Sequence, residues 1–178
     1  MTSLTQSYLD NADRFSAVVD AAGDWAAQSP CSEWTAAQVV DHVVSTQRGY
    51  LTKQGATLGD LPEGDPGRSW HTHLDEVRTT IADESFATRE FDGYFGRTTV
   101  DELLANFYGF DMLVHRWDLG AAVGAHVTFA DDELDRLETA MDGLGDMLYS
   151  DGVCKPALAV PDDAPRQQKL LGRLGRQG

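Results

Sequence analysis

The sequence has few cysteines and no long apolar run. Its 178 residues include two cysteines, Cys31 and Cys154, which lie far apart and form no CxxC pair. This argues against a disulfide framework and favours reduced thiols in a reducing compartment. No apolar run approaches the ~20 residues that a membrane-spanning helix needs. Residues 1–13 lack the basic start and apolar stretch of a signal peptide, so we expect a cytoplasmic protein.

Positive charge is also scarce. Lys and Arg total 14 against 29 Asp and Glu, which gives a formal net charge of −15. Such a surface repels phosphate backbones and anionic lipids, so we expect neither nucleic-acid nor membrane partners. The sequence contains no GxSxG, P-loop or GxGxxG motif. Any chemistry must therefore come from another arrangement of residues.

Helical periodicity dominates what is present. Hydrophobic residues make up 42% and charged residues 24%, which is typical of a globular protein, and we expect one domain over residues 1–178. Thr35 with Gln38, and Thr99 with Glu102, are capping boxes that mark two helix starts. Apolar spacing predicts helices over 4–22, from 36 onward, over 70–81, over 99–123 and over 131–148.

The segments between these helices read as loops and turns. Residues 55–68 are rich in Gly and Pro, and an Asp-Gly pair within 86–97 predicts a hairpin-like connection. Residues 152–178 form a Pro-punctuated C-terminal tail with one or two helical turns from Pro165. Because strands do not alternate with helices, the predicted fold class is all-α, a bundle of four main helices with a short C-terminal extension.

Three polar residues interrupt the apolar stretch "FYGFDMLVHRWDLGAAVG" over 107–124: Asp111, His115 and Asp118. Residues four apart on a helix are neighbours, so Asp111 and His115 point the same way. His42 lies at the edge of an apolar face on the helix that begins near Ala36. If the two faces meet in a bundle, His42, Asp111 and His115 converge. Imidazole and carboxylate groups bind Zn²⁺ and other first-row divalent ions, and three protein ligands leave a coordination position open.

Other interpretations of these residues stay open at this point. An inward-facing His is more often a hydrogen-bonded core residue than a ligand. Asp111 and His115 could form only an ion pair worth about 0.5 kcal/mol. Asp118 could pair with Arg116 or orient a ligating His. Against this, an unpaired acid buried at position 111 would cost several kcal/mol.

The other histidines, one cysteine and two tryptophans are less strongly indicated as site residues. We expect His71 and His73 to be solvated, although they could cover the site if the preceding loop folds over it, and we expect His126 to lie in a loop. Cys31 could be a thiolate ligand or nucleophile, but a small packing residue is the simpler interpretation. Trp34 and Trp117 are expected as core anchors, and either could line a pocket.

Three segments resemble a known family. "SPCSEWTAAQVVDHVV" and "DMLVHRWDLGAAVG" are similar to the two metal-site motifs of the DinB/YfiT-like superfamily, in the branch related to mycothiol-dependent maleylpyruvate isomerases. "AVPDDAPRQQKLLGRLGR" is similar to the C-terminal tail of an actinobacterial metal-binding subgroup. The resemblance implies a DinB-like four-helix bundle that holds a divalent metal through His42, Asp111 and His115. Zinc is the metal most expected, with nickel, manganese and iron as alternatives.

The resemblance also implies thiol chemistry. The leading hypothesis is a metal-dependent transferase or isomerase that uses mycothiol or a similar low-molecular-weight thiol as cosubstrate, with Asp118 orienting a ligating His. A metal-dependent hydrolase with Glu33 or Asp118 as general base is the second hypothesis. A non-catalytic metal-binding or ligand-binding protein is the third. Bundles of this kind can form homodimers. The sequence identifies no catalytic residue and no substrate.

Overall fold

The computed structural model describes residues 1–31, 33–94, 96–150 and 153–177. The chain forms two compact units, Met1–Ala125 and His126–Gly178, and each is described by itself. Apart from one two-stranded sheet and an isolated β-bridge, the regular structure of the described residues is helical, as predicted for the all-α class. Within these residues, no helix has both the length and the apolar character that a membrane crossing requires.

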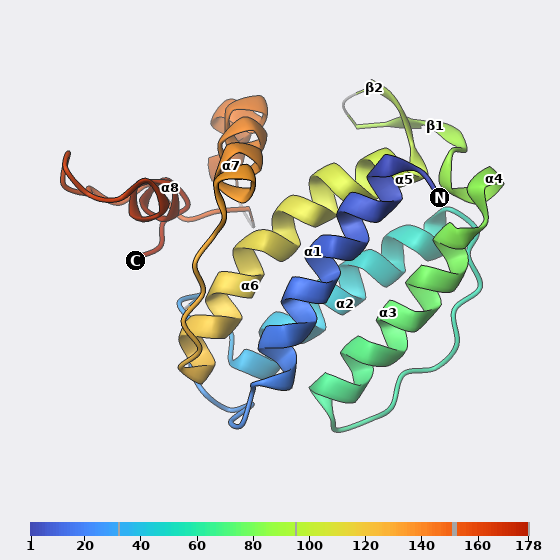
Figure 1. Cartoon of the computed structure of the whole chain (residues 1–178), viewed down its shortest axis with the longest axis horizontal. Helices are drawn as coiled ribbons and strands as arrows, with labels where there is room; N and C mark the ends of the chain where they lie inside the picture. Colours follow the sequence, from blue (N-terminus) through green and yellow to red (C-terminus); the bar gives the residue numbers. More distant parts are fainter. Residues whose placement is uncertain (32, 95, 151–152, 178) are drawn as a thin grey trace. The chain divides into compact units, whose positions relative to one another are not determined.

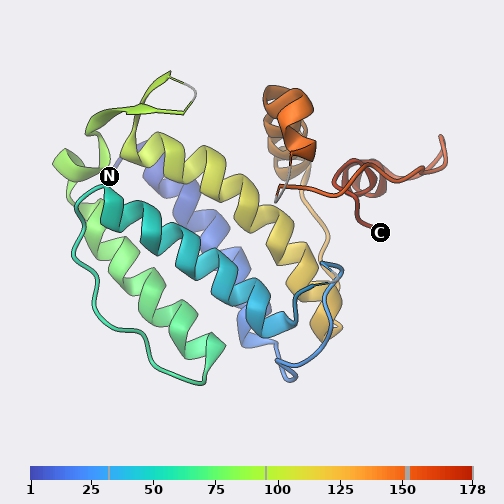
Figure 2. The same ribbon diagram turned by 180° about the vertical axis from the view of Figure 1, so that it is seen from behind.

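Long helices form the body of the first unit. They run alongside one another in Figures 1 and 2, and α1 and α2 each pack against both α3 and α6. Apolar side chains from all of them are buried between the helices, among them Phe15, Val43, Trp70 and Leu119. Because α2 packs directly on α6, the two helices with the predicted ligands meet. The bounds are α1 (Ser3–Asp20), α2 (Ala36–Lys53), α3 (Pro66–Ala82) and α6 (Gly109–Val123).

Capping residues determine where two of these helices begin. The predicted capping box is present: the Gln38 backbone N–H donates to Thr35 Oγ1, and the Thr35 N–H donates to Gln38 Oε1 at 2.9 Å. Helix α2 therefore begins at Ala36, as predicted. Helix α3 begins at Pro66, four residues before the predicted start at Trp70. Asp65 accepts from the third residue of the helix and Pro66 occupies the first position, a favourable start that the sequence analysis assigned to the loop.

The predicted helix over 99–123 is present but contains an irregular turn. Thr99 caps α5 (Val100–Leu103), a π-helical stretch follows over Leu104–Tyr108, and α6 continues from Gly109. Asn11 of α1 donates to the Gly109 carbonyl at 2.7 Å, which ties the first turn of α6 to its neighbour. Gly124 ends α6 in the left-handed region at φ 74°, as the sequence predicts. The π-helical turn thus lies immediately before the Asp111–Asp118 segment, a kind of irregularity that is frequent at functional sites.

A hairpin connects α3 to α5. After the short α4 (Glu84–Ala87), strands β1 (Glu90–Gly93) and β2 (Gly96–Thr99) pair antiparallel. The predicted hairpin is therefore confirmed, but its turn follows the Asp-Gly pair. Asp92 and Gly93 belong to β1, where they pair with Arg97 and Gly96.

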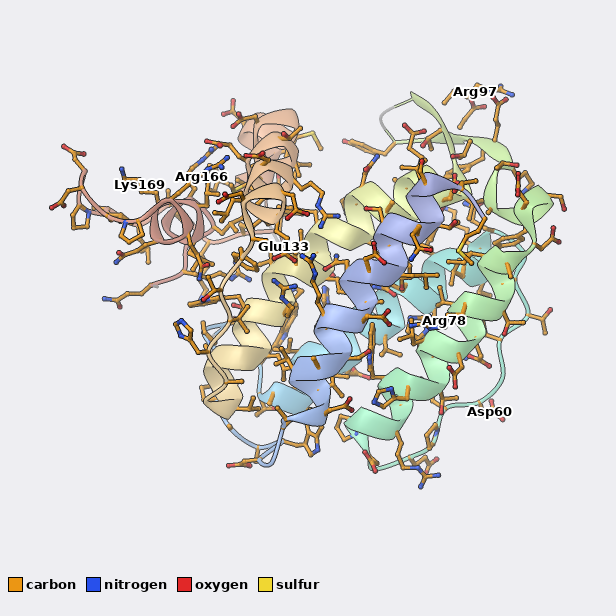
Figure 3. The ribbon with its side chains drawn as sticks, in the orientation of Figure 1. Asp60, Arg78, Arg97, Glu133, Arg166 and Lys169 are labelled. Carbon is orange, nitrogen blue, oxygen red and sulfur yellow. The ribbon has the colours of Figure 1, made fainter. Side chains whose placement is uncertain are left out.

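The second unit contains α7 (Asp131–Leu144), a 3₁₀ turn (Gly145–Tyr149) and α8 (Arg166–Arg173). Helix α7 ends before the predicted residue 148, because the chain takes a positive φ of 52° at Gly145. The predicted helical turns after Pro165 are confirmed as α8. Arg166 of α8, labelled in Figure 3, lies 2.7 Å from Asp135 and 2.6 Å from Glu138 of α7, so ion pairs join the two helices.

Candidate metal centre

Helices α2 and α6 bring together the three side chains predicted as ligands. His42 Nε2 of α2 lies 3.3 Å from Asp111 Oδ1 of α6, and His115 Nε2 lies 3.3 Å from the same oxygen. The two imidazole rings meet edge to face with centroids 4.9 Å apart. One ligand-capable atom from each residue lies within 4.8 Å of the other two. A single carboxylate oxygen is thus the meeting point of two imidazoles.

The environment of Asp111 suits a cation. Its Oδ2 atom is enclosed and has no hydrogen-bond partner among the described residues. Burial alone would raise the pKa of this carboxyl, but the His115 and His42 imidazoles hold the pKa well below its usual value. Asp111 is therefore ionised at neutral pH. An ionised carboxylate with one enclosed oxygen that lacks a hydrogen-bond partner is costly unless a positive group compensates it.

His115 uses both ring nitrogens. Nε2 faces Asp111, while Nδ1 lies 2.9 Å from Oδ2 of Asp118, which is fully buried one turn further along α6. Burial alone would lower the pKa of His115, but the two carboxylates raise the pKa to about 9. With no cation present, a proton on His115 thus offsets the negative charge of the site. The bond to Asp118 fixes the ring so that Nε2 points at the place where the other two candidate ligands meet.

The distances fit a small divalent ion. Two ligand atoms that each lie about 2.0–2.1 Å from a tetrahedral zinc are separated by roughly 3.3 Å. Both separations from Asp111 Oδ1 have this value, which is slightly longer than the usual N–H···O hydrogen bond of about 2.9 Å. Two imidazole nitrogens and one carboxylate oxygen also match zinc and other first-row metals chemically. The residues present therefore fit a metal with three protein ligands and a further position for an exogenous ligand.

The loop between α1 and α2 covers part of this centre. The Trp34 ring lies 4.5 Å from the His42 ring and 5.4 Å from the His115 ring, measured between centroids. Trp34 is half-buried and lines the site, which is the alternative that the sequence left open beside a core anchor. Cys31, expected as a small packing residue, is half-buried and donates its thiol hydrogen to Asp118 Oδ2 at 3.4 Å. The sequence did not predict the partners of either side chain, because nothing in it places this loop over α6.

The other histidines lie elsewhere. His71 is exposed on α3 and pairs with Asp20 at 2.8 Å, and His126 is exposed in a loop, both as predicted. The prediction that His73 is solvated is wrong, because its side chain is fully buried. His73 lies three residues after the buried Trp70 on α3, so both side chains face the core.

We expect the Asp118→Asn variant to bind zinc about 10- to 100-fold more weakly, the usual effect of losing a carboxylate partner of a ligating His. The neutral amide cannot stabilise positive charge on His115 as the carboxylate does at 2.9 Å. A competition titration with a chromophoric chelator measures the affinity. Asp101→Asn is the matched control, because Asp101 is another buried acid and is bonded by Thr2 and Thr99 instead. Unchanged zinc affinity in the Asp118 variant would contradict the assigned role.

Comparison with protein families identifies a match over most of the chain. The model of the mycothiol maleylpyruvate isomerase N-terminal domain matches residues 8–120, a span that includes His42, Asp111 and His115. Comparisons with curated proteins and with solved structures gave no match. The matched span exceeds half of the chain and confirms the family resemblance noted from the two metal-site motifs, whereas the tail motif over 159–176 lies outside it. The chain therefore belongs to the family of the mycothiol maleylpyruvate isomerase N-terminal domain.

Proposed function

We propose that helices α1, α2, α3 and α6 form a DinB-like four-helix bundle that holds a divalent metal through His42, Asp111 and His115. On this proposal the protein transfers or isomerises small electrophiles with the help of a mycothiol-type thiol. The observation that carries it is the convergence of the two imidazoles on Asp111 Oδ1 at 3.3 Å, within the span matched by a mycothiol isomerase domain. Zinc suits these donors best, and nickel, manganese and iron are alternatives.

The side chains around the centre have separable tasks in this proposal. A bound divalent ion would lower the pKa of a thiol at its remaining position and so supply a thiolate nucleophile. Asp111 contributes the negative charge that retains the ion. Asp118 Oδ2 accepts from His115 Nδ1 at 2.9 Å and so fixes the orientation of the ring. Trp34 covers one side of both imidazoles and limits the access of water from that side.

Thiol activation has more support than hydrolysis. A hydrolase needs a general base within reach of an activated water. Of the two bases suggested by the sequence, Asp118 is fully buried and already accepts hydrogen bonds from His115 and Cys31. Glu33 is exposed in the loop before α2, and within the described part of the chain no hydrogen bond or ion pair joins it to the centre. Neither residue is placed to deprotonate water, so hydrolysis remains the second candidate.

Thiol binding to the metal-loaded protein tests the proposal. We expect cobalt-substituted protein to show a sulfur-to-cobalt charge-transfer absorption that saturates as a cysteine-based thiol is added. The alcohol analogue of the same compound should give no such band. Turnover is then assayed with this thiol and either maleylpyruvate or an activated aryl halide. If the metal-loaded protein binds no thiol, the transferase and isomerase proposals fail. Protein that rejects zinc, nickel and manganese would support a non-catalytic binding role.

A further inference from the structure

The Asp118 carboxylate accepts hydrogen bonds from both His115 and Cys31. Asp118 Oδ2 accepts from His115 Nδ1 at 2.9 Å and from the Cys31 thiol at 3.4 Å. Asp118 is completely buried, and His115 is 6% exposed. Both donors draw on the same oxygen, so a stronger bond to one weakens the bond to the other. A continuous chain of contacts therefore runs from Cys31 through Asp118 to a proposed metal ligand.

Hydrogen bonds hold the backbone of Cys31 in place in the loop. Its carbonyl oxygen accepts from the Trp34 backbone N–H at 2.8 Å, from Ser29 Oγ at 3.1 Å and from Gln28 Nε2 at 3.3 Å. Gln28 also donates to the Trp34 carbonyl at 2.8 Å, which closes the turn. These bonds anchor the backbone from which the thiol reaches Asp118. The same turn carries Trp34 to the imidazoles, so both loop contacts with the centre depend on it.

The geometry favours a protonated thiol over a thiolate ligand. Ligand-capable atoms of Cys31, His115 and Asp118 do lie within 4.8 Å of one another, so a second cation could be imagined there. However, the 2.9 Å separation of His115 and Asp118 is that of a hydrogen bond. It is shorter than the roughly 3.3 Å expected for two ligands of one zinc. A thiolate beside the buried Asp118 carboxylate would also place two negative charges together.

We propose that Cys31 is a positioning residue of the metal centre, whose thiol bond to Asp118 limits how strongly Asp118 polarises His115. This inference rests on the proposed metal site. Without the thiol bond, Asp118 Oδ2 accepts the His115 hydrogen bond more strongly and makes that imidazole a stronger ligand. A second donor on the same oxygen moderates the effect. Cys31 thus sets the affinity of the centre without touching the metal.

Substitutions at Cys31 test the inference through zinc affinity. Cys31→Ala removes the donor, and we expect it to bind zinc about three- to tenfold more tightly. This is less than the roughly 10- to 100-fold effect of a direct carboxylate partner, because Cys31 is one bond further away. Cys31→Ser keeps a donor and should remain within about twofold of wild type. Cys154→Ala is the matched control, because Cys154 is half-buried in the other unit. A Cys31→Ala variant with equal or weaker affinity would overturn the proposal.

A second measurement needs no metal. In metal-free protein, the NMR signal of the His115 Nδ1 proton reports its hydrogen bond to Asp118. We expect the signal to move downfield in Cys31→Ala, as that bond strengthens, and to return toward its wild-type position in Cys31→Ser. If wild-type protein binds no zinc, the proposed function fails, yet this signal still decides the role of Cys31. An unmoved signal would overturn the inference. So would a cobalt-sulfur absorption that appears without added thiol and disappears in Cys31→Ser, since Cys31 would then be a ligand.

Discussion

Replacing Asp111 with Asn is expected to lower zinc affinity by more than about 100-fold. This exceeds the roughly 10- to 100-fold loss that follows when a hydrogen-bond partner of a metal ligand is removed. Asp111 Oδ1 lies 3.3 Å from both His42 and His115, so the variant loses the one negatively charged group among the three proposed ligands. The histidines hold the pKa of Asp111 well below its usual value, so the carboxylate needs no deprotonation before it binds a cation at neutral pH. The amide oxygen of Asn has similar shape without the charge, which separates ligation from packing.

The measurement is a zinc competition titration, accompanied by circular dichroism to verify the helical fold. Asp20→Asn is the matched control, because Asp20 also pairs with a histidine, His71, at 2.8 Å, but both side chains are exposed. It should bind zinc as wild type does. If the zinc affinity of Asp111→Asn stays within threefold of wild type, Asp111 is not a ligand. The metal proposal then loses its basis.

Helical geometry explains why much of this site could be predicted from the sequence. A spacing of four residues places Asp111 and His115 on one stripe of a helix wherever that helix lies. His42 required a further assumption, that the apolar faces of two helices meet. The capping box at Thr35 located the start of α2 correctly, so the position of His42 on its helix was also correct.

Contacts made by loops and irregular turns could not be predicted in this way. Cys31 and Trp34 reach the centre through a turn held by Gln28 and Ser29, and such bonds follow no periodicity that a sequence displays. The π-helical stretch over Leu104–Tyr108 likewise has no distinct sequence pattern. An error of four residues in the start of α3 was enough to place His73 at a helix junction instead of in the core.

The buried position of His73 has a consequence for stability in acid. His73 Nε2 lies 2.9 Å from Gln47 Oε1, which also accepts from the Tyr8 hydroxyl, and all three side chains are almost or fully inaccessible. Burial, helped by the positive charge of Arg48, lowers the pKa of His73 to about 3. In the unfolded chain its pKa is about 6.5. Between these values the unfolded state binds a proton that the folded state does not, so the free energy of unfolding must decrease as the pH falls.

Because His73 stays neutral in the folded state, we expect the free energy of unfolding to fall by about 1.4 kcal/mol for each pH unit below 6.5, or by about 2 kcal/mol at pH 5. The stability that the neutral, buried His73 provides is fully present above pH 6.5 and is lost progressively as the pH falls toward 3. Urea unfolding at pH 5, 6, 7 and 8 measures the slope for wild type, His73→Gln and His71→Gln. His73→Gln should be less stable at pH 8 but should lose less stability between pH 6.5 and 5. His71→Gln, which changes an exposed imidazole two residues earlier on α3, should retain the wild-type slope. Equal slopes for wild type and His73→Gln would mean that His73 accepts a proton in the folded protein as readily as in the unfolded chain.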